Sequence, residues 1–302
     1  MYRSYFIPAI ALMLALATGF ATAEEKRFEK KFPVSAGGTL ALTTDVGSVT
    51  VTGGSGPEVI VSALIEGRSS DVEKFVIEAQ QVGTGVEVTG KMPKSFWRFL
   101  QGSNFDVSFT ISIPRNFNVR LHTAGGNVSI ANVNGTIEGE TSGGDVALKQ
   151  SEGTANLGTS GGDIHVESVK GDLVGETSGG NIRVKTVTGS VKVETSGGNI
   201  SVEDVDGKVF AETSGGNVVL KVRGANKGIH AETSGGNVTV AIGKSVGATI
   251  DAATSGGEVE CDLPVTVSGK ISESRIKGTL NGGGELIYAH TSGGDVHIKA
   301  LD

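Results

Sequence analysis

Hydrophobic and polar residues alternate along short segments of the chain, and glycine-rich turns separate these segments. Within residues 177–194, Ile182 and Val184 alternate with charged residues, and Val191 and Val193 do the same after a Thr-Gly turn. Period-two alternation indicates β-strands with one buried face. The stretch therefore predicts two short strands and two turns, one at Ser-Gly-Gly and one at Thr-Gly.

The same unit recurs along most of the chain at a nearly constant spacing. The Thr of the T-S-G-G motif, or of T-A-G-G in the first unit, falls at Thr123, Thr141, Thr159, Thr177, Thr195, Thr213, Thr233, Thr254 and Thr291. The first five spacings are 18 residues, and the later ones are 20, 21 and 37. A fixed period of this size is typical of a solenoid. We interpret the late drift as loops inserted between otherwise regular coils.

Columns of equivalent residues define the inside of the predicted solenoid. The positions four residues before and five residues after each aligned Thr hold Val, Ile, Leu or Ala. We expect these columns to stack inward together with the Thr itself. Glycine suits the turns because it permits positive φ and lets neighbouring coils approach closely. The asparagines that follow the glycines are expected to form a ladder of side-chain amides: Asn127, Asn181, Asn199, Asn217 and Asn237.

One outward column predicts the register of the coils. Its charge alternates at every step, because it reads Lys149, Glu167, Lys185, Glu203 and Lys221. In a parallel stack with strands about 4.8 Å apart, each lysine would lie between two glutamates.

The N-terminal third follows the repeat less regularly. Residues 40–51 fit the unit if Thr44 takes the place of the aligned Thr, so the first coil is expected to begin near Leu40. A long interruption follows, with strand-like segments at residues 58–67 and 106–114 and a short helix expected within residues 71–80. We expect this region to cover the open end of the solenoid, because exposed terminal strands favour aggregation.

The chain begins with one cation, Arg3, a short apolar run and the small residues that end at Ala23. This pattern is typical of a secretory signal peptide over residues 1–23, cleaved after Ala23. We therefore expect an extracytoplasmic protein, periplasmic or secreted to the cell surface, with no transmembrane segment after cleavage. The net charge of −7 argues against a nucleic-acid partner, and the single cysteine, Cys261, excludes an intramolecular disulfide.

The repeat also carries a family resemblance. The run DVSFTISIPRNFNVRLHTAGGNVSIANVNGTIEGETSGGDVAL and the upstream EGRSSDVEKFVIEAQQVGTGVEV resemble the bacterial "putative adhesin" family, most tellingly in I-P-x-x-x-x-V-x-L-x-T-x-x-G-x-V at residues 113–128. The resemblance implies a single-stranded parallel β-helix outside the cytoplasm. It supplies no catalytic residues.

Candidate metal chemistry is confined to the column just before the aligned Thr. The unit lacks the third glycine and the later aspartate of the calcium-binding nonapeptide. Weak divalent-cation binding is the sharper hypothesis for the stacked carboxylates, and solvated side chains are the alternative. The candidates are Glu176, Glu194, Glu212 and Glu232.

Candidate catalytic chemistry is limited to one acidic cluster. Asp163, His165 and Glu167 are expected close together, with Asp145 one coil away. Catalysis by a glycosidase mechanism requires paired carboxylates at a defined separation. Nothing interrupts the repeat at this point to form a cleft, so we expect no catalytic site.

The segment KSFWRFL at residues 94–100 departs from the repeat and holds the only tryptophan. It either plugs the end of the solenoid or forms a patch that docks a partner. The candidate partner-binding residues are Phe96, Trp97, Arg98 and Phe99.

The sequence thus predicts an all-β chain, a right-handed parallel β-solenoid with about 18 residues per coil. Residues 24–122 would form the cap and first coils, and residues 123–302 the regular repeat, as one continuous domain. We expect a non-enzymatic binding or structural module at the cell envelope, an adhesin, without a cofactor and with an unidentified protein or glycan ligand. The alternatives are a polysaccharide lyase or hydrolase and a cation-stabilised β-roll.

Overall fold

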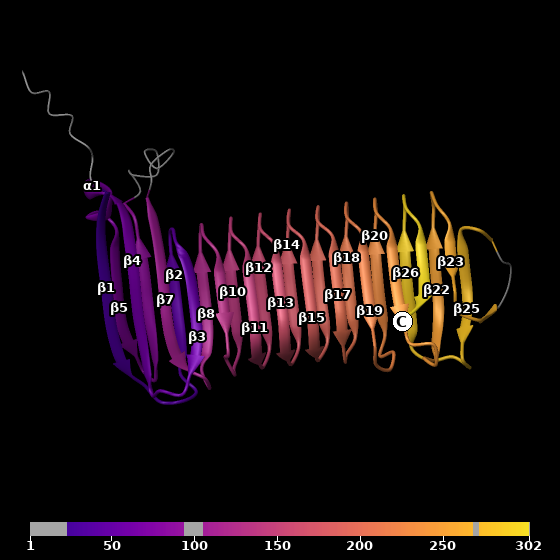
Figure 1. Cartoon of the computed structure of the whole chain (residues 1–302), viewed down its shortest axis with the longest axis horizontal. Coiled ribbons are helices and arrows are strands. Elements are labelled where there is room, and N and C mark those ends of the chain that lie inside the picture. Colours follow the sequence, from indigo (N-terminus) through magenta and orange to yellow (C-terminus); the bar gives the residue numbers. More distant parts are fainter. Residues whose placement is uncertain (1–22, 94–104, 268–271, 302) are drawn as a thin grey trace, which may run out of the picture.

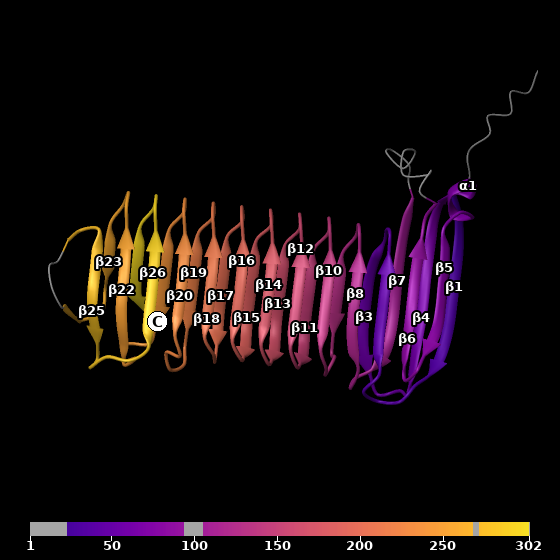
Figure 2. The same cartoon turned by 180° about the vertical axis from the view of Figure 1, so that it is seen from behind.

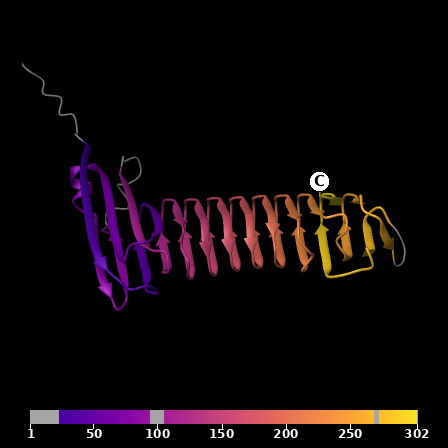
Figure 3. The ribbon, with the colours of Figure 1, turned by 60° about the horizontal axis from the view of Figure 1, so that its bottom comes forward.

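The protein is an elongated, nearly all-β molecule in which two long sheets face each other (Figures 1 and 2). The computed structural model describes residues 23–93, 105–267 and 272–301. The expected signal peptide, apart from Ala23, and the residues Phe96, Trp97, Arg98 and Phe99 lie outside the described residues. The rod is built from stacked coils, which confirms the β-solenoid (Figure 3).

Each coil of the middle region contributes one strand to each sheet. The strands of the 14-stranded sheet are β8 (Asn118–Thr123), β10 (Ile137–Thr141), β12 (Ala155–Thr159), β14 (Leu173–Thr177), β16 (Val191–Thr195), β18 (Val209–Thr213) and β20 (Ile229–Thr233). Those of the 13-stranded sheet are β9 (Val128–Ala131), β11 (Val146–Glu152), β13 (Ile164–Lys170), β15 (Ile182–Thr188), β17 (Ile200–Val205), β19 (Val218–Val222) and β21 (Val238–Ile242). Neighbouring strands are parallel, and each aligned Thr pairs with the next, as Thr141 does with Thr159.

The predicted inward columns form the core. Val191 and Ile200 are 1% exposed, and the equivalent residues of the other coils are likewise buried. The threonine column is buried too. The hydroxyl of Thr195 donates to the carbonyl oxygen of Gly180 on the preceding coil at 2.9 Å, and this bond recurs along the stack. Each Thr therefore packs its methyl group inward and still satisfies its polar atom.

The glycines of the T-S-G-G turns are required for close approach and not for their backbone angles. Of the described T-S-G-G glycines, none has a positive φ, so the expectation of positive φ is wrong there; Gly126 of the T-A-G-G turn does have one, at 116°. A Cβ atom on Gly198 would lie 1.9 Å from the carbonyl oxygen of Gly180. At Gly197 the nearest atom would be 3.5 Å away. Contact between coils therefore fixes the second glycine of each turn.

Positive φ occurs in the opposite turns at Gly153 and Gly171, and also at a non-glycine column on or just after the strands of the 13-stranded sheet. The residues of this column are Asn132, Gln150, Ser168, Thr186 and Asp204, with φ between 49° and 60°. At each of the last four, two outward residues separate two buried ones, as Lys149 and Gln150 separate Leu148 from Ser151. The extra residue bends the strand, as a β-bulge does.

The column after the glycines forms a ladder, but mainly between side chains and backbone. The backbone N–H of Asn199 donates to Oδ1 of Asn181 at 2.9 Å, and the backbone N–H of Asn181 donates to Oδ1 of Asp163 at 2.7 Å. A side-chain amide bond of the expected kind also joins Asn199 to Asn181 at 3.1 Å. Because the ladder needs only an acceptor oxygen, aspartate replaces asparagine at Asp145 and Asp163.

The predicted register of the charged column is confirmed. Lys149 pairs with Glu167, Glu167 with Lys185, Lys185 with Glu203, and Glu203 with Lys221. Nζ of Lys221 lies 2.8 Å from Oε1 of Glu203.

At the N-terminal end, β2 (Thr39–Thr44) and β3 (Ser48–Gly54) form the first coil. Leu40 pairs with Val119 and Thr44 with Thr123, as the repeat predicts. The next coil in space comes only at β8, because the chain between them builds the end of both sheets.

A mixed extension covers this end, with parallel strands next to the first coil and antiparallel strands beyond them. In the 13-stranded sheet, β7 (Asp106–Pro114) lies beside β3, followed by β4 (Glu58–Arg68) and β1 (Ala23–Pro33). In the other sheet, β6 (Gly85–Lys91) pairs with β2, and β5 (Val76–Val82) forms the edge. Phe75 and Phe109 are buried here with ring centroids 6.5 Å apart.

The helix expected within residues 71–80 is wrong in its extent. The helix α1 spans only Ser69–Val72, and the following residues form β5. The segment pairs with β6 through a tight turn in which Gly83 has a φ of 58°. A turn close behind an apolar segment favours a hairpin over a helix.

The C-terminal coils are not stacked in sequence order. After β20 and β21 the chain forms β22 (Ala248–Thr254) and β23 (Val259–Cys261). It then adds β24 (Val265–Val267) and β25 (Arg275–Leu280), which is antiparallel to β22 and covers it. The last strands, β26 (Leu286–Thr291) and β27 (Val296–Ala300), return between the two earlier coils.

This arrangement corrects our interpretation of the late spacings. The increase to 37 residues between Thr254 and Thr291 reflects the antiparallel pair β24 and β25 and the return of the chain, and not a loop between successive coils. Cys261, at the end of β23, is half-buried, and burial raises the pKa of its thiol. No helix among the described residues is long and apolar enough to cross a membrane.

Candidate functional site

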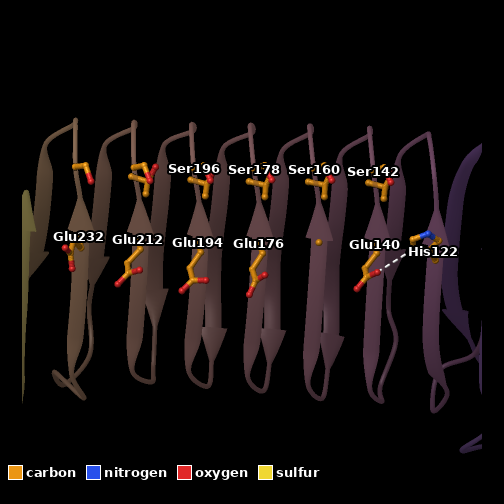
Figure 4. A pocket seen from close by; sticks show the side chains of 18 residues that line it. His122, Glu140, Ser142, Ser160, Glu176, Ser178, Glu194, Ser196, Glu212 and Glu232 are labelled. Atoms are coloured by element: carbon orange, nitrogen blue, oxygen red, sulfur yellow. Dashed lines mark ion pairs between the residues drawn. The ribbon is translucent and has the colours of Figure 1, made fainter. Parts of the chain in front are cut away.

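An acidic groove runs along the outer face of the 14-stranded sheet, across the coils (Figure 4). Its volume is about 740 Å³. One row of glutamates lies on the strands, and a row of serines lies beside it on the turns: Ser142, Ser160, Ser178, Ser196, Ser214 and Ser234. We call this feature the acidic groove.

The alternation of inward and outward side chains along each strand positions the glutamates. Each residue before a buried Thr must point outward, and the parallel register then places these residues in one line. The line reads His122, Glu140, Gly158, Glu176, Glu194, Glu212, Glu232 and His290. The four glutamates singled out in the sequence therefore lie on successive coils. Carboxylates stacked at about 4.8 Å repel one another, so the row favours a cationic or hydrogen-bond-donating ligand.

Few cations neutralise this row. Nζ of Lys192 lies 3.2 Å from Oε1 of Glu194, and Nδ1 of His122 lies 3.5 Å from Oε2 of Glu140. Among the residues that the structure describes, Glu176 has no ion-pair partner. The partners of Glu140, Glu212 and Glu232 are histidines, which carry a charge only when protonated, so Glu194 alone among the described glutamates of the row contacts a lysine or arginine.

A stack of aromatic rings borders the acidic groove. Phe210, His230 and Tyr288 are cross-strand neighbours, with ring centroids 4.5 Å apart at each step and planes within 8° of parallel. Lys192 continues the column, with its Nζ 5.7 Å from the centroid of Phe210. The faces of the inner rings cover one another, so the stack presents ring edges to the surface.

His230 connects the stack to the acidic groove. Its Nε2 lies 3.0 Å from Oε1 of Glu212 and 3.4 Å from Oε2 of Glu232. Burial, together with the charges of Glu232 and Glu212 and of Asp251, raises the pKa of the Tyr288 phenol. The phenol therefore remains neutral and can donate a hydrogen bond at ordinary pH.

The stack separates the acidic groove from a second, apolar one of about 500 Å³. The apolar groove is lined by Val174, Phe210 and Leu286, among others, and Leu286 is 46% exposed. Lys192 and Lys208 also line it. The two grooves differ in charge, so the aromatic ridge between them divides the face into chemically distinct strips.

An ion-pair cluster around Asp251 continues the column of the aromatic stack, because Asp251 pairs with Tyr288 across the strands. Arg275 and Lys277 contact its carboxylate at 3.0 and 2.9 Å, and Nε2 of His290 lies 3.4 Å away. Burial alone would raise the pKa of Asp251, but the hydrogen bonds from Lys277 and His290 and the charges of Arg275 and Lys277 together outweigh it and lower the pKa.

The acidic cluster considered for catalysis lies on the other sheet. Asp163, His165 and Glu167 belong to the outer face of the 13-stranded sheet and line neither groove. Oδ1 of Asp145 and of Asp163 each accept a backbone N–H of the next coil, so these carboxylates have a structural use. They are not gathered around a cleft.

The sequence pattern did not predict the aromatic stack, and neither His230 nor Tyr288 stands out in it. A signal was available, because I-H-A-E-T at Ile229–Thr233 and I-Y-A-H-T at residues 287–291 occupy the same columns. What the repeat could not show is that these two units are neighbours, since β26 returns to lie beside β20.

The fold and the site thus define the protein as a β-solenoid with a repeated acidic surface. A family model described as Toastrack DUF4097 matches residues 38–299. The chain belongs to this Toastrack family, whose function is unknown, and the resemblance to a "putative adhesin" family is thereby confirmed. No curated protein matches the chain.

Several solved structures resemble the chain weakly. One is described as a "putative adhesin" from Bacteroides fragilis, with 13% identity, a TM-score of 0.36 and coverage of 91% of this chain and 97% of the other. A "putative cell adhesion protein" from Clostridium sporogenes has 14% identity, a TM-score of 0.28 and coverage of 92% and 100%. A "putative lipid binding protein" from Parabacteroides distasonis has 11% identity, a TM-score of 0.36 and coverage of 91% and 97%. These values are too low to bear on the function of this chain.

Proposed function

We propose that the chain is a non-enzymatic binding module of the cell envelope, an adhesin, and that its ligand is a linear polymer lying in the acidic groove. The observation that carries the proposal is the length of the groove, which extends from His122 to Glu232 and offers a carboxylate or a hydroxyl at nearly every coil. A ligand that repeats along its own axis can use many such contacts at once. Weak individual contacts then sum to strong attachment.

Charge favours a polymer that bears amines and hydroxyls. The glutamates can accept hydrogen bonds from ammonium or hydroxyl groups, and the serines can donate or accept. Of the five glutamates in the row, only Glu194 contacts a lysine or arginine in the described part of the chain. A polysaccharide with free amino groups therefore complements the groove better than a neutral or anionic one.

The shape of the site argues for binding over catalysis. Glycosidases place two carboxylates on opposite sides of a bond that they cleave. Here the carboxylates lie in one row along the groove, on the same face of one sheet. The row can hold a chain along its length, but it does not place an acid and a base on either side of one bond.

The proposal is tested with two immobilised polymers that share one sugar backbone and differ in N-acetylation, and hence in charge. We expect the chain to bind chitosan, which bears free amines, and to release it as salt screens the groove. We expect weaker binding to the N-acetylated form, chitin. Absence of chitosan binding at low salt would overturn the polymer assignment. New reducing ends after incubation would favour the carbohydrate-active enzyme instead, and calcium-dependent thermal stabilisation would favour the cation-stabilised β-roll.

The envelope location is tested separately, by protease treatment of intact producing cells. We expect the chain to be cleaved from outside or to be found in the medium, which suits an adhesin. Protection until the outer envelope is opened would exclude adhesion to external surfaces. A binding role within the envelope would then remain, and residues 94–100 would be the first segment to examine for a partner.

A further inference from the structure

We propose that Glu212, His230 and Glu232 form a binding site for a zinc ion, at the point where the acidic groove meets the aromatic stack. The three side chains come from two neighbouring coils, with Glu212 on β18 and the other two on β20. One ligand atom from each lies within 4.8 Å of the others. The proposal concerns one defined site and does not depend on the polymer assigned to the groove.

The distances suit a tetrahedral metal ion. Zinc lies about 2.0–2.2 Å from histidine nitrogen and carboxylate oxygen, so two donors of one tetrahedron are separated by roughly 3.3–3.6 Å. Nε2 of His230 lies 3.0 Å from the Glu212 carboxylate and 3.4 Å from that of Glu232. Small side-chain rotations would therefore bring all three donors into the first coordination shell.

A proton on His230 can compensate the two neighbouring carboxylates less well than a metal ion can. Nε2 of His230 can carry one N–H, which can be donated fully to one carboxylate. Two carboxylates converge on that nitrogen, and they also repel each other as members of the stacked row. A divalent cation would bind the nitrogen lone pair and offset the charge of both carboxylates.

The aromatic stack orients the imidazole. His230 is held between Phe210 and Tyr288, with planes 8° and 7° from parallel. This packing keeps the ring perpendicular to the row and its Nε2 edge toward the glutamates. Metal-binding histidines commonly need such outer contacts to fix the ring.

The three donor atoms suit zinc better than calcium. The presence of an imidazole beside the row favours this place in the groove over the others. Calcium prefers six to eight oxygen ligands, whereas one imidazole with two carboxylates is a ligand set of zinc sites that keep an open position. Elsewhere the flanking column holds no imidazole, since Val174 lies beside Glu176 and Lys192 beside Glu194 on their strands. His122, which stands in the row itself, contacts a single carboxylate of the row, that of Glu140. The side chains of the trio remain 31–46% exposed, so an ion has access.

The test is calorimetric titration of the chain, without a polyhistidine tag, with zinc chloride. We expect one equivalent to bind, and cobalt to give the visible absorption of a tetrahedral complex. His230→Phe should abolish binding while keeping a stacked ring, since Phe210 shows that the column accepts phenylalanine. Glu212→Gln should weaken binding at least about tenfold.

Glu176→Gln is the matched control, because it removes a carboxylate from the same row two coils away from Glu212. We expect zinc affinity within about twofold of that of the unmodified chain. Equal weakening by Glu176→Gln and Glu212→Gln would show diffuse binding along the groove and overturn the site. Absence of zinc uptake by the folded chain would overturn it as well. Chitosan binding measured with a chelator present tests the polymer proposal independently.

Discussion

Tyr288 stacks on His230, with ring centroids 4.5 Å apart, although the two residues belong to strands that are far apart in the sequence. The contact exists because β26 lies between β20 and β22. Along the chain, β22 and the antiparallel strand β25 come before β26, yet β26 lies between β20 and β22 in the sheet. The last coil of the sequence is an interior coil of the solenoid.

The returning coil should contribute strongly to stability. Ile287 on β26 is fully buried between coils, so Ile287→Ala is expected to lower the free energy of unfolding by about 2–5 kcal/mol. The neighbouring Leu286 points outward and is 46% exposed, so Leu286→Ala should change the free energy by no more than about 0.5 kcal/mol. Urea unfolding measures both. Similar effects of the two changes would argue against the interior position of β26.

The two glycines of one turn should differ sharply when replaced. Gly198→Ala would force a Cβ atom against the backbone of Gly180, and we expect it to cost more than about 2 kcal/mol. Gly197→Ala meets only ordinary contacts and should lie within about 1 kcal/mol of the unmodified chain. Thermal unfolding compares the pair directly. A mild effect at Gly198 would show that neighbouring coils are less closely packed than the structure indicates.

A substitution in the column of non-glycine residues with positive φ should stabilise the folded protein. Thr186 has a φ of 58°, which a β-branched residue adopts at a cost, and its side chain is exposed. Asparagine tolerates this conformation and already occupies the column at Asn132. Thr186→Asn is expected to raise the free energy of unfolding by about 1 kcal/mol. The reverse change, Asn132→Thr, should lower it, and a stabilising Asn132→Thr would contradict the explanation.

The ion pair between Glu203 and Lys221 should make a small, pH-dependent contribution. The hydrogen bond from Lys221 lowers the pKa of Glu203 below its ordinary value, and the charges of Lys185 and Arg223 act in the same direction. The contribution is therefore fully present above the ordinary pKa of the unfolded chain. It is lost as the pH falls through the lowered pKa of the folded state.

A double-mutant cycle with Glu203→Gln and Lys221→Met measures this coupling. Because both side chains are about a third or more exposed, we expect only about 0.5 kcal/mol at neutral pH and less at high salt. In acid, where Glu203 is protonated in both states, the coupling should vanish. A coupling that persists unchanged in acid would exclude an ionic origin.

The regular part of the fold could be predicted from the sequence because each residue type there meets the same surroundings in every coil. The inward columns, the buried threonines and the charge register all follow from one period and from parity, as the pairing of Glu167 with Lys185 shows. The row from Glu176 to Glu232 follows from the same two rules. Local pattern is sufficient wherever spatial order equals sequence order.

The remainder depended on tertiary pairing that a repeat does not encode. To predict that Tyr288 lies beside His230, one must know that β26 inserts between β20 and β22. The strand at β5 depends on its partner β6 rather than on its own apolar spacing. The role of the second turn glycine depends on a carbonyl group of another coil. The handedness of the winding and the roles of Phe96, Trp97, Arg98 and Phe99 stay predictions.

The central claim is that the acidic groove binds the ligand, and one comparison of binding tests it most directly. The double variant Glu176→Gln with Glu194→Gln removes two carboxylates from the groove, and Glu167→Gln with Glu203→Gln removes two from the opposite sheet. Both change the net charge equally, so non-specific attraction is matched. We predict that the groove variant loses chitosan binding while the opposite-sheet variant retains it. Equal loss in both variants, or retention in the groove variant, would contradict the assignment of the groove as the binding face.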